Sequence, residues 1–121
     1  MKKAVLDTSF IISCARQGID FLDGLGLMGL DVIIPNMVML ELKGLSRKNE
    51  GAKLALEILG KKRDMFKESD FGKYAKTTDR AIIVFSEKNH GAFIATLDRD
   101  IKAKTANRKI VIRQRKRLKI V

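Results

Sequence analysis

The stretch of sequence that decides the expected fold is Ala4-Val5-Leu6-Asp7-Thr8-Ser9-Phe10-Ile11-Ile12. Its first three residues are apolar and typical of a short buried strand. Thr8 or Ser9 can cap a helix that follows at once, and this helix is expected to run to about Gln17 and to stop at Gly18. A strand that passes directly into a helix favours an α/β fold, with Asp7 at the junction.

The same alternation of strands and helices continues along the chain. Further strands are expected at residues 32–34, near 71–75, at 92–97 and at 110–112, the last of these extended or repeated at 118–121. Helices are expected over residues 19–29, 36–44, 46–65, 79–88 and 98–106. Strands that alternate with helices predict a parallel sheet with helices on both faces, and thus a single three-layer α/β/α domain over residues 1–121.

The net charge of +11 is concentrated at the C-terminal end of the chain. Residues 101–121 hold nine basic groups and no acid, whereas residues 1–100 hold sixteen basic and fourteen acidic groups. A basic segment on a balanced body is typical of a protein that binds nucleic acid. Four basic side chains at every second position would share one face of an extended strand and could follow an RNA backbone: Arg113, Arg115, Arg117 and Lys119. The alternative is that this row only protects a sheet edge from pairing.

Composition excludes several classes of protein. Apolar residues make up 45% of the chain, which is enough for a folded core. Cys14 is the only cysteine, which rules out a disulfide framework and a cysteine-based zinc ribbon and fits a reducing, cytoplasmic location. His90 has no cysteine or histidine at ligand spacing, so it is not expected to bind a metal. No apolar run is long enough to span a bilayer, and Asp7 comes too early for a secretory signal, so no membrane partner is expected.

Five acids fall where a parallel sheet would bring them to one edge. Asp7 follows the first strand, and Asp98 follows the strand at 92–97, with Asp100 two residues further. Asp79 opens a helix, and Glu41 is a single acid within an apolar helical stretch. Because ligands bind beyond the carboxyl ends of parallel strands, these acids are expected to converge. Clustered carboxylates repel one another, which implies a bound divalent cation, and oxygen ligands favour Mg²⁺ or Mn²⁺ over zinc.

Each acid also has a purely structural interpretation. Asp79 and Asp98 could be acids that the dipole favours at the start of a helix, and Asp7 could cap the first helix. Glu41 could lie on the exposed side of its helix. The structural interpretation is weaker for the set than for any single member, since all five positions are expected at the same edge of the sheet.

Four motifs occur in order along the chain: Val5-Leu6-Asp7-Thr8-Ser9, Ile34-Pro35 followed by Glu41-Leu42, Thr78-Asp79-Arg80-Ala81-Ile82, and Ala95-Thr96-Leu97-Asp98-Arg99-Asp100. On these motifs the chain resembles the PIN domain, a family of small metal-dependent endoribonucleases, over almost its whole length. The segment from Gly72 to Lys102 is especially similar to the branch of the family that cuts pre-ribosomal RNA. The same core pattern occurs in the VapC toxins.

The resemblance implies an open parallel sheet of about five strands with helices on both sides. It also implies that four catalytic acids bind the metal ions, with Asp100 as an accessory ligand: Asp7, Glu41, Asp79 and Asp98. Thr8 or Ser9 would then be a polar neighbour of Asp7, and Thr96 a polar neighbour of Asp98.

The expected function is hydrolysis of phosphodiester bonds in RNA by a Mg²⁺- or Mn²⁺-dependent endoribonuclease, in the processing of ribosomal or other RNA. Two alternatives remain: a VapC-like toxin of a toxin–antitoxin pair, and a catalytically idle RNA-binding assembly module. The expected partners are single-stranded or structured RNA, with an antitoxin or a ribosome-assembly partner. A homodimer is also expected, because PIN domains commonly pair and the chain has an apolar stretch that could equally be a core helix: Leu22, Leu25, Leu27, Met28 and Leu30.

Overall fold

The computed structural model describes residues 2–114 and 116–121 and contains one mixed sheet. Its strands are β1 (Lys2–Leu6), β2 (Leu30–Pro35), β3 (Lys67–Ser69), β4 (Phe93–Ala95), β5 (Lys109–Arg113) and β6 (Arg117–Ile120). They lie in the order β3-β2-β1-β4-β5-β6, and neighbouring strands are parallel except for β5 and β6. The expected parallel sheet of about five strands is confirmed, and an antiparallel sixth strand extends it.

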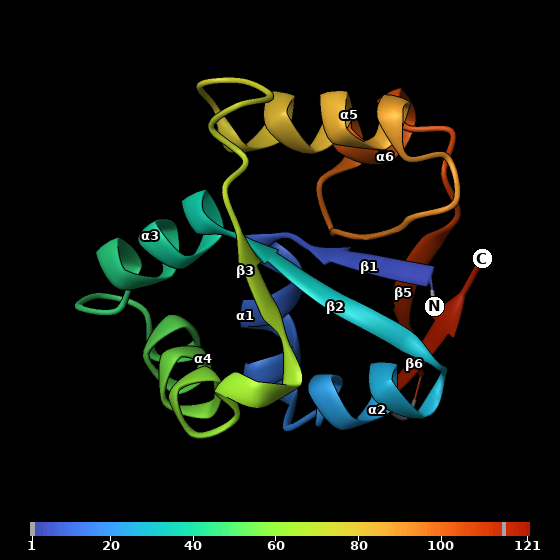
Figure 1. The fold of residues 1–121 in the computed structure, drawn as a ribbon. Helices are drawn as coiled ribbons and strands as arrows, with labels where there is room; N and C mark the ends of the chain where they lie inside the picture. Colours follow the sequence, from blue (N-terminus) through green and yellow to red (C-terminus); the bar gives the residue numbers. More distant parts are fainter. Residues whose placement is uncertain (1, 115) are drawn as a thin grey trace.

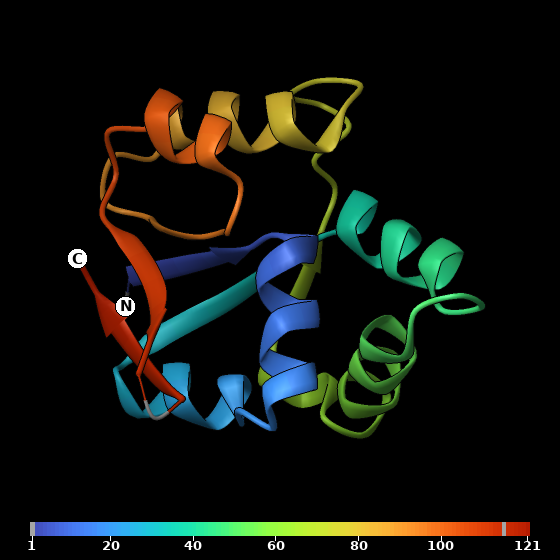
Figure 2. The ribbon, with the colours of Figure 1, turned by 180° about the vertical axis from the view of Figure 1, so that it is seen from behind.

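Helices cover both faces of this sheet, as the alternation in the sequence predicted (Figure 1 and Figure 2). They are α1 (Thr8–Gln17), α2 (Phe21–Leu27), α3 (Asn36–Leu45), α4 (Glu50–Lys61), α5 (Thr78–Lys88) and α6 (Arg99–Lys104), with a short 3₁₀ helix at Arg63–Met65. The first four α-helices pack through one apolar cluster, and α5 and α6 pack through a second cluster on the other face. The three-layer α/β/α arrangement is therefore confirmed.

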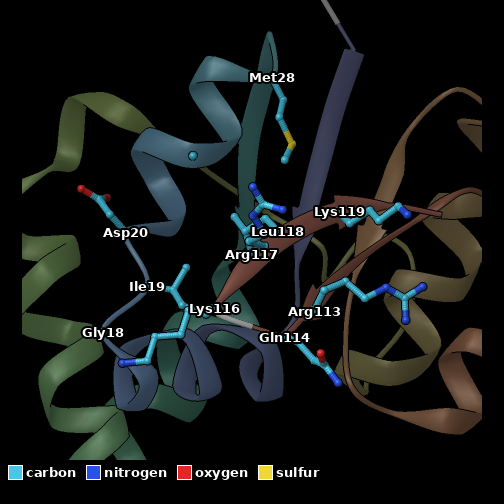
Figure 3. Close-up of a pocket in the computed structure, with 11 residues that line it drawn as sticks. Gly18, Ile19, Asp20, Met28, Arg113, Gln114, Lys116, Arg117, Leu118 and Lys119 are labelled. Atoms are coloured by element: carbon cyan, nitrogen blue, oxygen red, sulfur yellow. The ribbon is translucent and has the colours of Figure 1, made fainter.

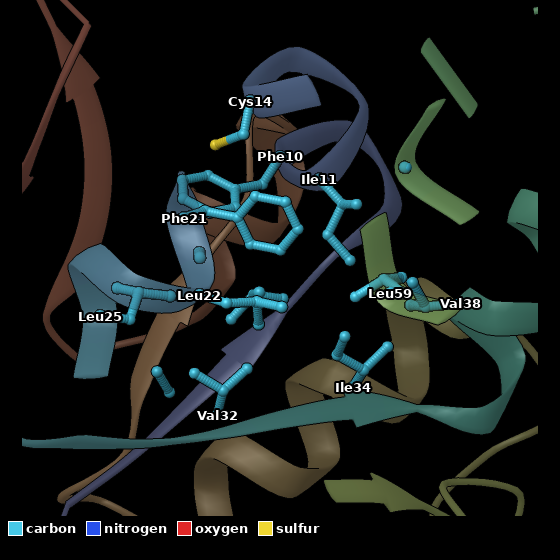
Figure 4. Packing of buried hydrophobic residues seen from close by; sticks show 14 of the residues in the cluster. Phe10, Ile11, Cys14, Phe21, Leu22, Leu25, Val32, Ile34, Val38 and Leu59 are labelled. Atoms are coloured by element: carbon cyan, nitrogen blue, oxygen red, sulfur yellow. The ribbon is translucent and has the colours of Figure 1, made fainter. Parts of the chain in front are cut away.

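The central strands contribute to both clusters, because successive side chains of a strand point to opposite faces. Ala4 and Leu6 of β1 belong to the first cluster, whereas Val5 between them belongs to the second. Figure 4 shows the first cluster, in which Phe10 of α1 packs beside Phe21 of α2. Burial on both faces explains why the paired segments Ala4–Leu6 of β1 and Phe93–Ala95 of β4 are continuously apolar instead of alternating with polar residues.

The strand expected at residues 71–75 is wrong, and the structure places β3 just before it. β3 pairs with β2, and its own side chains remain exposed or half-buried. Phe71 instead buries its ring against Phe85 of α5, with the ring centroids 4.9 Å apart. The aromatic residue that suggested a strand is therefore a core residue carried by a loop.

The long helix expected over residues 46–65 is shorter in the structure. α4 begins at Glu50, because the Asn49 side chain caps it by accepting a hydrogen bond from the Ala52 N–H at 3.0 Å. It ends at Lys61, and the separate 3₁₀ helix follows. The apolar spacing predicted the buried face of this helix, whereas the polar cap determines where it begins.

The basic row at the C-terminal end forms a hairpin and not one continuous strand. Arg113 ends β5 and Arg117 begins β6, and the two are direct partners across the antiparallel ladder. Lys116 lies in the turn with a left-handed backbone, at a φ of 59°. Positions two apart and direct cross-strand partners share a face, so Arg113, Arg117 and Lys119 still lie on one side of the hairpin. Arg115, the fourth member of the row, lies outside the described residues.

The apolar stretch around α2 lies mostly in the core. Leu22, Leu25 and Leu30 are buried, whereas Leu27 is 89% exposed and Met28 is 38% exposed. Ordinary core packing therefore accounts for three of the five apolar residues on which the homodimer was predicted. The homodimer stays a prediction. Among the residues that the structure describes, no helix has both the length and the apolar character needed to cross a membrane.

Gly51 determines how closely α4 approaches α1. A Cβ atom at this position would lie 2.8 Å from Ile12 Cγ2 and 2.8 Å from Arg16 Cγ, inside the normal contact distance of carbon atoms. We expect Gly51→Ala to destabilise the fold by about 1–3 kcal/mol, although alanine favours a helix by about 1 kcal/mol. Gly60→Ala is the matched control, because a Cβ at Gly60 in the same helix meets no atom within 4 Å. Urea unfolding measures both variants, and equal stabilities would contradict the packing argument.

Candidate active site at the carboxyl edge of the sheet

The carboxyl ends of β1 and β4 meet at one edge of the sheet and place the acids that follow these strands. β1 and β4 are parallel neighbours at the centre of the sheet, as the sequence predicted, with Leu6 paired to Ala95. The backbone N–H of Asp7 continues this pairing by donating to the Ala95 carbonyl at 2.9 Å. Asp98 follows the end of β4 as the N-terminal cap of α6. Asp7 and Asp98 therefore leave the sheet at the same edge.

Two hydroxyl groups tie the loop after β4 to Asp7. The Thr96 hydroxyl donates to Oδ2 of Asp7 at 2.7 Å and accepts from the Asp98 backbone N–H at 3.0 Å. The Ser9 hydroxyl donates to the same oxygen of Asp7 at 3.4 Å and accepts from the Leu97 backbone N–H at 3.1 Å. Thr96 is thus a direct link between the side chain of one acid and the backbone of the other.

Asp7 is the buried member of the five acids, with 5% of its surface exposed. Its Oδ1 accepts from the Thr8 backbone N–H at 2.8 Å, so Asp7 caps α1 in place of the hydroxyl residues that follow it. Burial raises the pKa of the Asp7 carboxyl, while hydrogen bonds from Thr96 and Thr8 lower it. The negative charges of Glu41 and Asp79 raise it further, and the net shift is upward. Asp7 therefore holds its charge in an unfavourable environment.

Glu41 reaches the same edge from α3. The Thr8 hydroxyl donates to Oε1 of Glu41 at 2.5 Å, which ties α3 to the start of α1. Glu41 itself is exposed, whereas its helix neighbours Val38, Met39 and Leu42 are buried in the core. Glu41 therefore lies on the exposed side of α3, as the structural interpretation expected, and this side places its carboxylate beside Thr8. Exposure of Glu41 is thus compatible with a role in the site.

Asp79 lies in the first turn of α5, where burial and the charges of other acids act on its carboxyl group. Partial burial raises the pKa of the Asp79 carboxyl most, and the negative charges of Asp98, Glu41 and Asp100 raise it further. Glu41 acts in the same way on Asp7. Charge interactions thus connect Asp7 and Asp79 with the other three acids at this edge of the sheet, and we call the five acids together the acidic cluster.

Asp98 and Asp100 have different surroundings within the acidic cluster. Oδ1 of Asp98 caps α6 by accepting from the backbone N–H groups of Asp100 at 2.8 Å and Ile101 at 3.1 Å. This capping fixes the orientation of the Asp98 carboxylate. Asp100 is exposed and forms an ion pair with Lys104, one turn further along α6, at 3.2 Å. Asp100 is therefore the more peripheral of the two acids.

The side chains of the acidic cluster offer only carboxylate oxygens, with the hydroxyls of Thr8, Ser9 and Thr96 beside them. Hard oxygen donors of this kind fit Mg²⁺ or Mn²⁺ better than zinc. Within residues 2–114 and 116–121, no three His, Cys, Asp or Glu side chains are grouped closely enough to hold a metal ion.

Replacement of Thr96 by valine tests the link between the two acids. Valine keeps the shape of threonine but leaves the Asp98 N–H without its acceptor and Oδ2 of Asp7 with only the longer hydrogen bond from Ser9. We expect Thr96→Val to destabilise the fold by about 1–3 kcal/mol, because unpaired buried polar groups are costly. Thr96→Ser keeps the hydroxyl and should lose less. Urea unfolding of the two variants decides the matter, and a valine variant as stable as the serine variant would show that the link contributes nothing.

Comparison with known proteins gives a match for nearly the whole chain. The sequence model of a family described as PIN like domain matches residues 4–117. Among solved structures, the PIN domain endonuclease Utp24 is similar with a TM-score of 0.76 and 21% identity, over 98% of this chain and 95% of that one. VapBC2 from Rickettsia felis, bound to a DNA fragment from its promoter, gives a TM-score of 0.59 and 16% identity, over 88% and 98%. A domain of a functionally unknown protein from Methanocaldococcus jannaschii gives 0.59 and 18%, over 100% and 99%. No curated protein matches the sequence.

Proposed function

The chain belongs to the PIN-like domain family, whose members are generally nucleases, and we propose that it is a metal-dependent endoribonuclease. The observation that best supports this proposal is the acidic cluster, in which burial and the charges of neighbouring carboxylates from separate elements raise the pKa values of Asp7 and Asp79. Such a cluster destabilises the fold unless a cation balances its charge, so its presence at the ligand-binding edge of a parallel sheet favours a metal-dependent function.

Four residues of the acidic cluster are proposed to hold the metal, with Asp100 as an accessory: Asp7, Glu41, Asp79 and Asp98. Their side chains would have to lie closer together around a bound cation than they do in this structure. When bound, Mg²⁺ or Mn²⁺ would provide a nucleophilic hydroxide and offset the negative charge that develops on the phosphate and the leaving oxygen. Carboxylates suit this task because they bind hard cations through oxygen.

The hydroxyl residues around the acidic cluster are proposed to hold its carboxylates in place before the substrate arrives. Thr96 and Ser9 both donate to Asp7, and Thr8 donates to Glu41. Groups that orient metal-binding side chains influence metal affinity as well as activity. These three residues are therefore positioning residues in the proposed site.

RNA is proposed as the substrate on the basis of charge. Residues 101–121 contain nine basic groups and no acidic group, and such an excess of positive charge attracts a polyanion. Arg113, Arg117 and Lys119 share one exposed face of the hairpin and are proposed to contact RNA phosphates. Arg115 was predicted to join them and lies outside the described residues.

A role in RNA processing is favoured over that of a toxin. The motif similarity of residues 72–102 to the branch that cuts pre-ribosomal RNA supports this choice, and so does the greater structural similarity to Utp24 than to VapBC2. In a processing role, the expected protein partner is a ribosome-assembly factor. In a toxin role, the expected partner is an antitoxin. The intact set of acids counts against an idle RNA-binding module.

A cleavage assay with a structured RNA labelled at either end tests the proposed function. We expect internal cuts when Mg²⁺ or Mn²⁺ is present and none in EDTA, because the carboxylates alone do not supply a nucleophile. A DNA of the same sequence serves as the control for substrate class. Cleavage that persists in EDTA, or no cleavage at any concentration of either metal, would contradict the proposal.

A further inference from the structure

The basic hairpin and the α1–α2 region line an open pocket of about 920 Å³. One wall is formed by the hairpin residues Arg113, Lys116 and Arg117, and the other by residues 18–20, Gly24 and Met28. Figure 3 shows the Lys116 side chain extending toward Gly18 and the Arg117 side chain extending toward Met28. The volume lies within the range of about 300–1,000 Å³ that is usual for sites of small ligands.

The hairpin wall carries positive charge that the described part of the chain does not balance. Arg113 and Arg117 are direct cross-strand partners, an arrangement of like charges that destabilises a hairpin. The described salt bridges are Lys62 with Asp20, Lys62 with Asp23, and Lys104 with Asp100, and none of them involves the hairpin. An anion bound between the two walls would relieve this repulsion.

The Asp20 carboxylate lines the pocket but forms its ion pair with Lys62, outside the hairpin. Asp20 accepts two hydrogen bonds from the Lys62 ammonium, each at 3.2 Å, and these raise the pKa of Lys62. Asp20 therefore makes its ion pair away from the hairpin. The other residues on the same wall as Asp20 include Ile19, Gly24 and Met28, which carry no charge. Leu118, on the hairpin side of the pocket, is also apolar.

A pocket with cations on one wall and apolar surface on the other suits a nucleotide. Phosphate oxygens would contact Lys116 and Arg117, and a base or ribose would pack against the partly exposed Met28. We propose that this pocket binds a nucleotide of a single-stranded RNA segment that lies outside the acidic cluster. This inference deepens the proposed function and rests on RNA being the substrate.

The fold fixes how far this nucleotide lies from the point of cleavage. α1 begins beside Asp7 and ends at Gly18, which lines the pocket. Its ten residues span about 15 Å, so an RNA strand has to cover roughly this distance between the acidic cluster and the pocket. An RNA must therefore extend several nucleotides beyond the acidic cluster to reach the pocket.

Binding of an RNA of about 12 nucleotides, measured by fluorescence anisotropy in EDTA, tests the pocket without requiring cleavage. The test protein carries Lys116→Gly and Arg117→Gln, since glycine fits the left-handed backbone of Lys116. The matched control carries Lys53→Gln and Lys61→Gln, which remove two exposed charges from α4. We expect the hairpin variant to bind about tenfold more weakly and its log–log salt slope to fall by about 1.4, at ~0.7 per phosphate contact. The control should bind close to wild type.

Equal affinities of the hairpin variant and the control variant would overturn the pocket assignment. So would an acidic peptide of similar length that competes with the RNA at equal concentration, because the site would then be a protein-docking surface. In cleavage assays, the hairpin variant should raise KM without lowering kcat, and only for RNAs long enough to reach from the cut to the pocket. An equal effect on shorter RNAs would contradict the pocket. Absence of cleavage by wild-type protein would contradict the proposed function and leave the binding result as the test of the pocket.

Discussion

Replacement of Asp98 by asparagine is expected to lower the rate of RNA cleavage by at least about 100-fold while the protein stays folded. The charge is lost from the acidic cluster, and stabilisation by a bound metal of several kcal/mol is lost with it. The fold should survive, because asparagine is also a good N-terminal cap and can accept the hydrogen bonds from Asp100 and Ile101. Single-turnover cleavage with saturating protein measures the loss directly.

The control for this experiment removes an aspartate charge elsewhere on the surface. Asp64 is exposed in the 3₁₀ helix that follows α4, and Asp64→Asn has the same change in charge and size. It should cleave at the wild-type rate. A similar loss in both variants would indicate an effect of net charge, and a fully active Asp98→Asn protein would remove Asp98 from the proposed site.

Addition of Mn²⁺ is expected to raise the melting temperature of the wild-type protein by roughly 10 °C. At about 100 times its dissociation constant, a ligand that binds only the folded state adds about 2.7 kcal/mol, and a chain of this length gains roughly 4 °C for each kcal/mol. Asp79→Asn should show a smaller rise, because one of the proposed ligands is weakened. Differential scanning calorimetry in EDTA and in Mn²⁺ gives both values.

The same variant should melt at a higher temperature than wild type in EDTA. Burial and the neighbouring charges of Asp98, Glu41 and Asp100 raise the pKa of Asp79 in the folded state. A carboxyl whose pKa is raised by folding costs stability once it is ionised, so stability falls as pH rises through its folded pKa and the cost persists at neutral pH. Asparagine removes that cost. An Asp79→Asn protein that is less stable than wild type in EDTA, yet gains as much from Mn²⁺, would contradict both roles of Asp79.

The central strands of the fold could be predicted because burial on both faces makes them continuously apolar. Val5 and Ile94 face one cluster while their neighbours Leu6 and Ala95 face the other, so no polar residue interrupts the buried segments 4–6 and 93–95. The junctions after these strands followed from the same pattern, which is why Asp7 and Asp98 were placed at one edge of the sheet. The order of β1 and β4 as neighbours followed from the expected parallel sheet.

The two edges of the sheet could not be predicted in the same way. β3 consists of Lys67-Glu68-Ser69, which has no apolar pattern and joins the sheet through backbone pairing alone. At the other edge, the turn of the hairpin places Lys116 at a positive φ, where a glycine or asparagine would have signalled a turn. Lys116 counted among the nine basic groups of residues 101–121 but was not placed in the row of four RNA-binding side chains.

Hydrogen bonds within the candidate site were only partly predictable. Thr96 and Ser9 were expected as polar neighbours of the acids, but the contact of Thr96 with Asp7 joins residues 89 positions apart. The contact of Ser9 with the Leu97 backbone spans 88 positions. Contacts of this range depend on strand register, which the apolar pattern of the sequence does not determine to within one residue.

The claim that the acidic cluster binds divalent cations is tested most directly by anomalous scattering from crystals of the protein grown with Mn²⁺. We expect an anomalous peak within about 2.2 Å of carboxylate oxygens of both Asp7 and Asp98, since small divalent cations bind oxygen at about 2.0–2.2 Å. The peak should disappear in crystals of the Asp98→Asn protein grown in the same way. Wild-type crystals that show no anomalous peak between Asp7 and Asp98, at a Mn²⁺ concentration that supports RNA cleavage in solution, would contradict the metal site.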